Sequence, residues 1–439
     1  MPETAVFSAN SAGTAGAVSR SSSNEIPRGS LAGNAANLMI KNTFIEVEYS
    51  QLCKYKQNSP GDMFVTQKNP SDGRVITALS DGLGSGIKAG VLAGLTATMA
   101  VKFISFNIPI KRASEIIMNT LPVCSERGIS YATFTLIDIS QDATVKVMEY
   151  DNPPCVLIRH KTVVDLEKEK TAFQRQNKTT GPKNDTSVFY SLFTAQHGDR
   201  LIYFSDGVSQ AGMGTKINPF GWTAKKAHAF ALDQVMRNPD ISARDLSHSI
   251  AQQASLFDIG KPKDDISCGV VYFREPRDMM VLTGPTMHRE SVSEMAGIFA
   301  SFTGKKILSG GTTATIISEI LGKQIKVNMK SYDRNIPPYS EMEGADLVTE
   351  GIITLGAVSE MLEHYSENDA YTLKQNAATR IVNMFMESDR ITFIVGTAIN
   401  EAHQDPTMPV ELDIRRNVIK RIASLLKEKF RKEIIIKYF

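Results

Sequence analysis

The chain has 439 residues, of which 42% are hydrophobic and 22% are charged, which is ordinary for two or three globular domains. A formal net charge of +2 gives no global reason to expect nucleic acid or an anionic membrane as a partner. The four cysteines, Cys53, Cys124, Cys155 and Cys268, form no CxxC pair, which argues against zinc or disulfides and favours the cytoplasm. No apolar run reaches the roughly 18–20 residues needed to span a bilayer: the best candidate, 89–106, is broken by a lysine and is expected to be a buried helix.

The first forty residues differ in composition from the rest. Residues 1–40 are dominated by Ala, Ser, Gly, Asn and Thr, which bury too little apolar surface to offset the entropy of ordering. We therefore predict a disordered tail or an added leader. A Ser-rich transit peptide is the alternative, but its few basic residues are balanced by acidic ones.

Clear periodicity begins near residue 42. In chain order it predicts strands 43–49, 62–67 and 74–80, helices 87–104 and 112–125, strands 130–139, 144–150, 155–160, 187–193 and 200–204, helix 242–257 and strand 267–273. Runs of strands interrupted by runs of helices predict an α+β fold for residues 41–275.

A domain boundary is expected near residues 274–278, where the pattern changes. Beyond it the predicted elements are strand 279–282, helix 291–302, strand 306–308, helices 312–321, 356–363 and 373–386, strand 391–395, helix 411–429 and strand 433–438. This alternation predicts a smaller α/β domain of regulatory or ligand-binding type over residues 276–439. The last helix carries many Lys and Arg residues, which we interpret as its solvated face.

Aspartates follow several of the predicted strands in the first domain. They lie in Gly61-Asp62, Asp81-Gly82, Asp206-Gly207 and Asp264-Asp265. Hard divalent cations take oxygen ligands, usually a few carboxylates plus waters. A glycine after the aspartate lets the chain turn sharply and leaves its carbonyl open to a metal. Two such ions activate water and hold a phosphoryl oxygen, and Asp81 is the candidate bridging ligand.

A turn is the simplest reading of any single Asp-Gly dipeptide, and Asp72-Gly73 is interpreted as only that. The order of the motifs favours more than turns. A hairpin and a glycine-rich turn precede two helices, a second hairpin, a Pro-Pro, a strand ending in Asp-Gly and an Asp-Asp pair before a strand.

On these motifs, residues 45–275 resemble the SpoIIE-type branch of the bacterial metal-dependent protein phosphatases, the type 2C superfamily. The motifs are Gly61-Asp62, residues 80–86, Asn152-Pro153-Pro154, residues 198–208 and residues 264–267. The resemblance implies a four-layer αββα phosphatase sandwich that binds two Mn²⁺ or Mg²⁺ ions. It also implies hydrolysis of phosphoserine or phosphothreonine on a protein by attack of a metal-activated water, without a phosphoenzyme.

The resemblance assigns roles to the motif residues. Asp81 would bridge the two metal ions and Gly82 would ligate through its carbonyl. Asp206 and Asp264 would hold one of the ions, so Asp81, Asp206 and Asp264 form the expected catalytic set.

Two further ligands and three departures complete this comparison. Asp62 would lie near the other ion, and Asp265 follows the ligand position, although its role and that of its neighbour could be exchanged. Eukaryotic members carry a proposed general acid, a His, where this chain has Leu83, so no acid is named. The usual Gly-His before Pro-Pro is Asp151-Asn152 here, and Ser267 replaces a common Thr.

The partners expected from the resemblance are a phosphorylated protein, of the kind related to anti-anti-sigma factors, in bacterial signalling. No nucleic acid or membrane is expected, and a homodimer is left open. The alternative is a catalytically silent phosphatase fold that acts as a binding or scaffold protein, whose C-terminal α/β domain senses a small anionic ligand. Residues 310–313, Gly-Gly-Thr-Thr, suit an anion, but a tight strand–helix turn is the simpler interpretation, and Asp346 and Glu350 are taken as loop residues.

Overall fold

The computed structural model describes residues 43–69, 72–84, 86–120, 132–173, 186–286, 289–329, 333–365, 376–397 and 410–439. These residues belong to the compact unit Asn42–Phe439. The predicted tail over residues 1–40 lies outside the described residues, as does Cys124.

Two antiparallel sheets and the helices beside them make up the first half of this unit. The first sheet has the order β1 (Phe44–Leu52), β11 (Ile266–Arg274), β10 (Arg200–Phe204), β6 (Val156–Arg159) and β7 (Thr162–Val164). The second has the order β2 (Asp62–Lys68), β3 (Val75–Asp81), β4 (Phe134–Ile139), β5 (Thr144–Tyr150), β9 (Thr186–Thr194) and β8 (Glu169–Phe173). The helices are α2 (Ile87–Ser105), α3 (Ile110–Thr120), α4 (Asp206–Ser209), α5 (Ala224–Arg237) and α6 (Ala243–Phe257).

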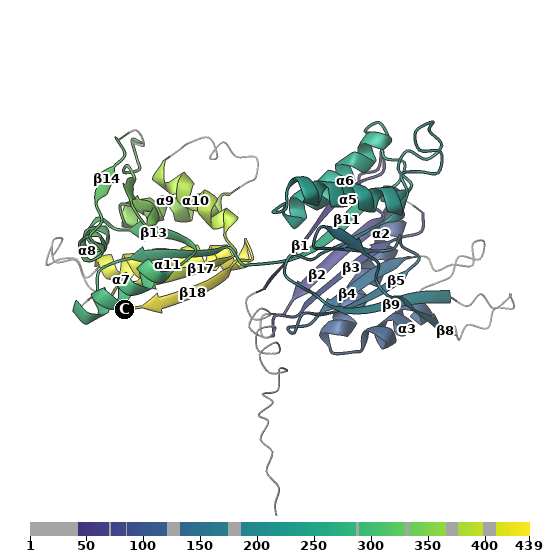
Figure 1. Ribbon diagram of the computed structural model, residues 1–439, viewed down its shortest axis with the longest axis horizontal. Helices are drawn as coiled ribbons and strands as arrows, with labels where there is room; N and C mark the ends of the chain where they lie inside the picture. The colour runs from purple at the N-terminus through teal and green to yellow at the C-terminus, as the bar shows by residue number, and fades with distance from the viewer. Residues whose placement is uncertain are drawn as a thin grey trace, which may run out of the picture. The chain divides into compact units, whose positions relative to one another are not determined.

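Each of these sheets has its own helical cover. Apolar residues of α2 and α3 share one core cluster with β3, β4 and β5, and those of α5 and α6 share another with β6, β10 and β11. Figure 1 shows α5 and α6 on one side of the sheets and α3 on the other. The sheets meet through Tyr203 of β10, which is fully buried and whose hydroxyl lies 2.9 Å from Oγ1 of Thr77 in β3. The predicted α+β fold is confirmed, and these contacts are those expected of a helix–sheet–sheet–helix sandwich.

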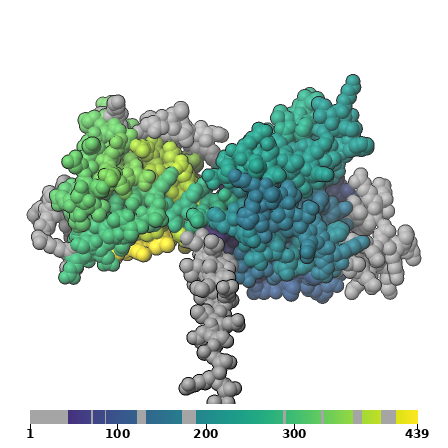
Figure 2. Space-filling model, viewed as in Figure 1, coloured from purple at the N-terminus to yellow at the C-terminus, as the bar shows by residue number. Residues whose placement is uncertain are grey.

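Helix α2 is longer and more apolar than predicted from the sequence. Among the described helices it is the one whose length and composition would suffice to cross a membrane, so the expectation that no such run exists was wrong. In the fold its small residues, among them Ala93 and Ala97, are buried against the second sheet. Its opposite face exposes Ile87 and Val91, so the helix is buried along one side only. Side chains fill the space that the ribbon leaves between the elements (Figure 2).

A third sheet lies wholly within residues 278–438. Its order is β14 (Ile325–Val327), β15 (Ser340–Met342), β16 (Ala345–Thr349), β13 (Lys305–Ser309), β12 (Asp278–Thr283), β17 (Arg390–Val395) and β18 (Glu433–Tyr438). The helices are α7 (Arg289–Ser301), α8 (Gly311–Leu321), α9 (Ile352–Glu363), α10 (Ala377–Glu387) and α11 (Val410–Glu428).

Five strands of this sheet are parallel, and both faces are covered. Met279 and Val281 point into the cluster formed with α9, α10 and α11, whereas Met280 and Leu282 point into the cluster formed with α7 and α8. The parallel strands occur in the order third, second, first, fourth and fifth along the chain, which is the order of doubly wound dinucleotide-binding sheets. The alternation of strands and helices predicted for this region is therefore present.

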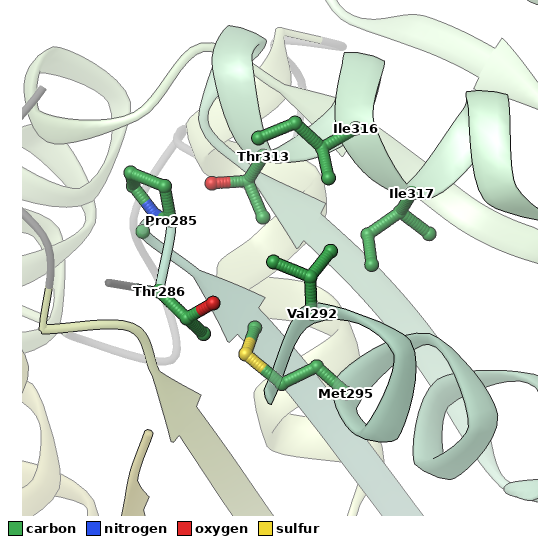
Figure 3. A pocket seen from close by; sticks show the side chains of 8 residues that line it. Pro285, Thr286, Val292, Met295, Thr313, Ile316 and Ile317 are labelled. Carbon is green, nitrogen blue, oxygen red and sulfur yellow. The ribbon is translucent and has the colours of Figure 1, made fainter. Parts of the chain in front are cut away.

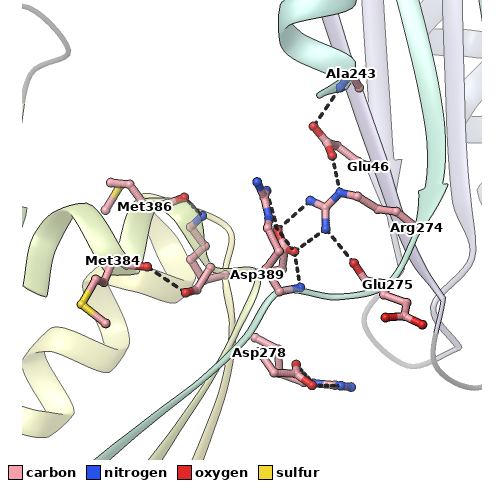
Figure 4. A network of polar contacts seen from close by, with 12 residues as sticks. Glu46, Ala243, Arg274, Glu275, Asp278, Met384, Met386 and Asp389 are labelled. Carbon is pink, nitrogen blue, oxygen red and sulfur yellow. Dashed lines mark hydrogen bonds and ion pairs between the residues drawn. The ribbon is translucent and has the colours of Figure 1, made fainter. Parts of the chain in front are cut away.

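A buried ion network lies where β11 leads into β12 (Figure 4). The guanidinium of Arg274, at the end of β11, donates from Nε to Glu46 at 2.5 Å and from Nη1 and Nη2 to Asp389 at 2.5 and 2.9 Å. Glu46 also accepts from the backbone N–H of Ala243 at the start of α6. Burial opposes ionisation of Asp389, but the hydrogen bonds from Arg274 and Arg277 prevail and lower its pKa to about 2.

Candidate metal centre

The first two aspartates of the predicted set are brought together by the β2–β3 hairpin. Asp62 is the first residue of β2 and Asp81 the last of β3, and the antiparallel register places them opposite each other. Asp72-Gly73 lies in the turn at the other end of the hairpin, where Asp72 accepts a hydrogen bond from the N–H of Arg74 at 3.0 Å. Asp72-Gly73 is therefore a turn, as predicted, whereas Asp81 of Asp81-Gly82 ends a strand.

The other two aspartates come from the first sheet. Asp206 follows the end of β10 and is the first residue of α4, and Asp264 lies just before β11. Neighbouring backbones join the two segments, because the N–H of Ser205 donates to the carbonyl of Ser267 at 3.0 Å. The four carboxylates thus reach one place from two sheets, and Asp62, Asp206 and Asp264 all act electrostatically on Asp81.

Glycine is required after each of the two strand-ending aspartates. A Cβ added at Gly82 would lie 2.1 Å from the carbonyl oxygen of Ala89 in α2, and one at Gly207 would lie 2.1 Å from that of Asp265. Each distance is far too short for a Cβ, so glycine is required at Gly82 by the backbone of α2 and at Gly207 by the backbone of the Asp264-Asp265 motif. Gly73 has only open space around its Cβ position and a φ of +67°, as a turn requires.

Repulsion and burial dominate the electrostatics of this cluster. Burial, followed by the charges of Asp62, Asp206 and Asp264, raises the pKa of Asp81 to about 10. Burial also raises the pKa of Asp62 to about 7, against the hydroxyls of Ser205 and Ser267. The pKa of Asp206 is raised by burial and by Asp264. Like charges that gather without a counterion in this way are unfavourable, and a cation would relieve the cost.

The adjacent pair Asp264-Asp265 separates into two roles. Both carboxylate oxygens of Asp265 accept backbone hydrogen bonds, from the N–H of Lys54 at 2.8 Å and from that of Gly61 at 2.7 Å. Asp264 is more exposed, and its carboxylate lies 3.7 Å from Nζ of Lys54. The arrangement favours Asp264 as the ligand and Asp265 as the residue that holds the Gly61-Asp62 segment in place.

Several residues near the cluster were not identified from the sequence. Gln210, one helical turn after Asp206, donates from Nε2 to its carboxylate at 2.7 Å, a pairing that the i, i+4 spacing could have suggested. Asn152 of the Pro-Pro motif donates from Nδ2 to Oγ1 of Thr135 at 3.1 Å and so fixes its loop against β4. The charge of Asp151 contributes to the raised pKa of Asp206; the sequence noted Asp151 only as a departure from the family pattern and gave it no role.

The residues fit a hard divalent cation, although they are not closed around one. Within the described part of the chain, no three His, Cys, Asp or Glu side chains stand close enough to form a ready-made metal group. However, Asp62 is only 2% exposed and its Oδ2 has no hydrogen-bond partner, which leaves a buried carboxylate oxygen open. Oxygen donors with an excess of negative charge are the set that Mn²⁺ and Mg²⁺ prefer.

The Gly-Gly-Thr-Thr segment of the C-terminal domain opens helix α8. Gly310 has a φ of 126° and donates its N–H to the carbonyl of Thr349 at 2.9 Å. A small cavity beside it is lined by two threonines and otherwise by apolar residues or glycine (Figure 3): Gly284, Pro285, Thr286, Val292, Met295, Thr313, Ile316 and Ile317. None of these lining residues carries the positive charge that would balance an anion. Asp346, expected in a loop, lies in strand β16, where its carboxylate accepts a hydrogen bond from the N–H of Lys306.

Comparison with known proteins adds a family to this description. Residues 71–274 match the family model of the stage II sporulation protein E, SpoIIE. This confirms the predicted resemblance of this part of the chain to SpoIIE. No curated protein matches the chain.

Several solved structures align with parts of the chain at low sequence identity. The phosphatase domain of SpoIIE from Bacillus subtilis, solved with a fragment of its regulatory domain, is 20% identical with a TM-score of 0.42 and covers 53% of this chain and 63% of that one. The RsbU and RsbW domains of a Mycobacterium tuberculosis protein are 15% identical with a TM-score of 0.40, covering 64% and 71%. RsbX in complex with magnesium is 15% identical with a TM-score of 0.36, covering 52% and 95%. The chain therefore spans less than two thirds of that SpoIIE structure.

Proposed function

We propose that the chain is a metal-dependent phosphatase that hydrolyses phosphoserine or phosphothreonine on a protein substrate in bacterial signalling. The observation that carries the proposal is the cluster of Asp62, Asp81, Asp206 and Asp264 at the ends of strands from two sheets. The family match of residues 71–274 supports a phosphatase. The free thiols of the described cysteines Cys53, Cys155 and Cys268 agree with a cytoplasmic location.

Asp81, Asp206, Asp264 and Asp62, with the carbonyl of Gly82, would hold two Mn²⁺ or Mg²⁺ ions. When bound, such ions supply Lewis-acid activation of water and neutralise charge that develops on the phosphoryl oxygens. The residues around them contribute positioning. Asp265 fixes the loop that carries Asp62 through two backbone N–H groups, and Gln210 orients the carboxylate of Asp206.

The proposed partner is a phosphorylated protein substrate related to anti-anti-sigma factors, because the resemblance implies that substrate class. The C-terminal domain would regulate the phosphatase domain or bind a ligand. Silent scaffolding remains the competing function, and the intact set of aspartates counts against it.

The test is the hydrolysis of p-nitrophenyl phosphate and of a phosphoserine protein, with and without Mn²⁺. We expect metal-dependent turnover that Asp206→Asn reduces by at least about a hundredfold, since it removes a ligand charge. Asp72→Asn is the matched control, because that residue is the aspartate of the same dipeptide in a turn, and it should leave turnover unchanged. Folded protein that neither binds Mn²⁺ nor turns over either substrate would refute the proposal.

A further inference from the structure

Large apolar side chains are exposed on two turns next to the aspartate cluster. The turn after α4, residues 210–222, exposes 78% of Ile217 and 82% of Phe220, and the last turn of α6 with the turn that follows it exposes 66% of Leu256 and 84% of Ile259. Single exposed apolar residues are common, but several on adjoining turns mark a surface for protein contact. We call these four residues, with Tyr55 and Met213, the apolar platform.

Hydrogen bonds join the two turns to each other and to the aspartates. The buried carboxylate of Asp258 accepts from the N–H of Gly212 at 2.9 Å and from that of Lys263 at 3.1 Å, and Nζ of Lys263 donates to the carbonyl of Met213 at 2.8 Å. The first turn begins at Gln210, which contacts the carboxylate of Asp206. The platform is therefore continuous with the candidate metal centre and is held rigidly beside it.

The backbone at Ile259 is strained in a way that serves no packing need. Its φ is +57°, a left-handed conformation that β-branched residues rarely adopt, and its side chain is almost fully exposed. Glycine would occupy this position at lower cost. Strain of this kind is typical of functional positions, and here its effect is to present an isoleucine to solvent.

Lysines surround the platform. The loop that contains Tyr55 is joined to the second turn by a hydrogen bond from its N–H to the carbonyl of Pro262 at 2.8 Å, and Nζ of Lys261 lies 5.5 Å from the centre of its ring. The basic residues on these three segments are Lys54, Lys56, Lys216, Lys261 and Lys263. The acidic residues on the same segments are Asp258 and Asp265, both buried and hydrogen-bonded to backbone N–H groups, and the candidate ligand Asp264. Lys54 lies 3.7 Å from the carboxylate of Asp264, so the positive charge beside the platform comes from Lys56, Lys216, Lys261 and Lys263.

We propose that the apolar platform and its lysines form the docking surface for the phosphoprotein substrate, and that this substrate presents apolar side chains flanked by carboxylates close to the phosphorylated residue. The inference rests on the proposed phosphatase function. Aromatic and branched aliphatic side chains would supply the contact energy, and the lysines would attract an acidic partner and the phosphate itself. Continuity with the aspartate cluster and the charge of the surface favour a substrate over a second copy of the chain.

The test uses two fluorescein-labelled phosphoserine peptides that differ only in their flanking residues. One has Leu, Phe and Glu around the phosphoserine, and the other has Gly and Ser. Binding to the full chain is measured by fluorescence anisotropy in EDTA, which does not depend on turnover, and phosphate release is measured with Mn²⁺. The variant combines Phe220→Ser with Ile259→Gly, which removes two platform side chains and relieves the strained φ. Phe106→Ser, 76% exposed just beyond the far end of α2, is the matched control.

We expect the apolar–acidic peptide to bind at least about tenfold more tightly than the Gly/Ser peptide, and the double variant to lose that preference. Its turnover of p-nitrophenyl phosphate should remain within about twofold of the parent chain's, since that substrate is too small to reach the platform. Equal binding of both peptides, or a double variant that keeps the preference, would overturn the docking surface. A second result would also overturn it: a parent chain that self-associates on sedimentation and shows no peptide preference, with a double variant that no longer self-associates. The platform would then join two copies of the chain. Selective binding without any Mn²⁺-dependent turnover would instead reject the phosphatase function and leave the docking surface standing.

Discussion

Replacing Asp81 by Asn separates two effects of the aspartate cluster, its destabilisation of the metal-free chain and its contribution to metal-dependent phosphate release. The substitution keeps the shape of the side chain and places a permanently neutral amide among Asp62, Asp206 and Asp264. The pKa of Asp81 is raised from 3.8 to about 10, so the metal-free chain must fold with this group protonated near neutral pH. Between an unfolded-state pKa of 3.8 and about pH 7.5, proton uptake costs at most about 5 kcal/mol, at about 1.36 kcal/mol per pH unit.

Since the carboxylates share this repulsion, we expect Asp81→Asn to stabilise the metal-free chain by about 1–3 kcal/mol. Urea denaturation in EDTA at about pH 7.5 measures the change. The same variant should lose Mn²⁺-dependent phosphate release and should gain little stability when Mn²⁺ is added, because it lacks the bridging charge. A variant that is less stable than the parent chain in EDTA, or that retains its metal-dependent turnover, would refute the reasoning.

Three further predictions follow from other contacts. The raised pKa of Asp62, about 7 against 3.8, means that the folded metal-free chain binds the extra proton, so its unfolding free energy should fall as pH rises from about 4 to 7, and a flat profile in EDTA would contradict this. Gly207→Ala should lower the unfolding free energy measured in urea by more than about 2 kcal/mol, because the added Cβ would meet a carbonyl oxygen at 2.1 Å. Gly356→Ala, in the open middle of α9, is the control and should raise the unfolding free energy by about 0.5–1 kcal/mol. Equal effects of the two substitutions would refute the packing argument. Asp389→Asn should cost about 2–3 kcal/mol by leaving Arg274 with Glu46 as its one acidic partner. The difference in unfolding free energy should shrink as pH falls from about 4 to 2, where the parent chain loses the same charge, and a constant difference would exclude the ion pair as its cause.

Strong local patterns made much of the fold predictable. Strand β5 occupies the predicted residues 144–150, and helix α6 begins within one residue of the expected start because Ser242 accepts a hydrogen bond from the N–H of Asp245 as its cap. Helix α5 was missed because its buried face is made of Ala227, Ala231 and Val235, which give only a weak apolar period. The strands β14 and β15 were missed because they have only three residues each, and β16 was missed because Asp346 was taken as a loop residue.

The candidate site was likewise predictable in part. The aspartates were identifiable because each lies at or next to the end of a predicted strand, and because glycines stand where the backbone packs closely, at Gly82 and Gly207. The roles of the adjacent pair were left open by the sequence, because only tertiary packing brings the N–H groups of Lys54 and Gly61 to the carboxylate of Asp265. Contacts between segments about two hundred residues apart carry no local signal.

The most direct test of a binuclear metal phosphatase is calorimetric titration of the metal-stripped chain with Mn²⁺, followed at each point by phosphate release from a phosphoserine protein. The account predicts about two ions bound per chain and turnover that rises with their occupancy. Turnover that persists in excess EDTA, or saturation with Mn²⁺ that brings no phosphate release, would contradict it.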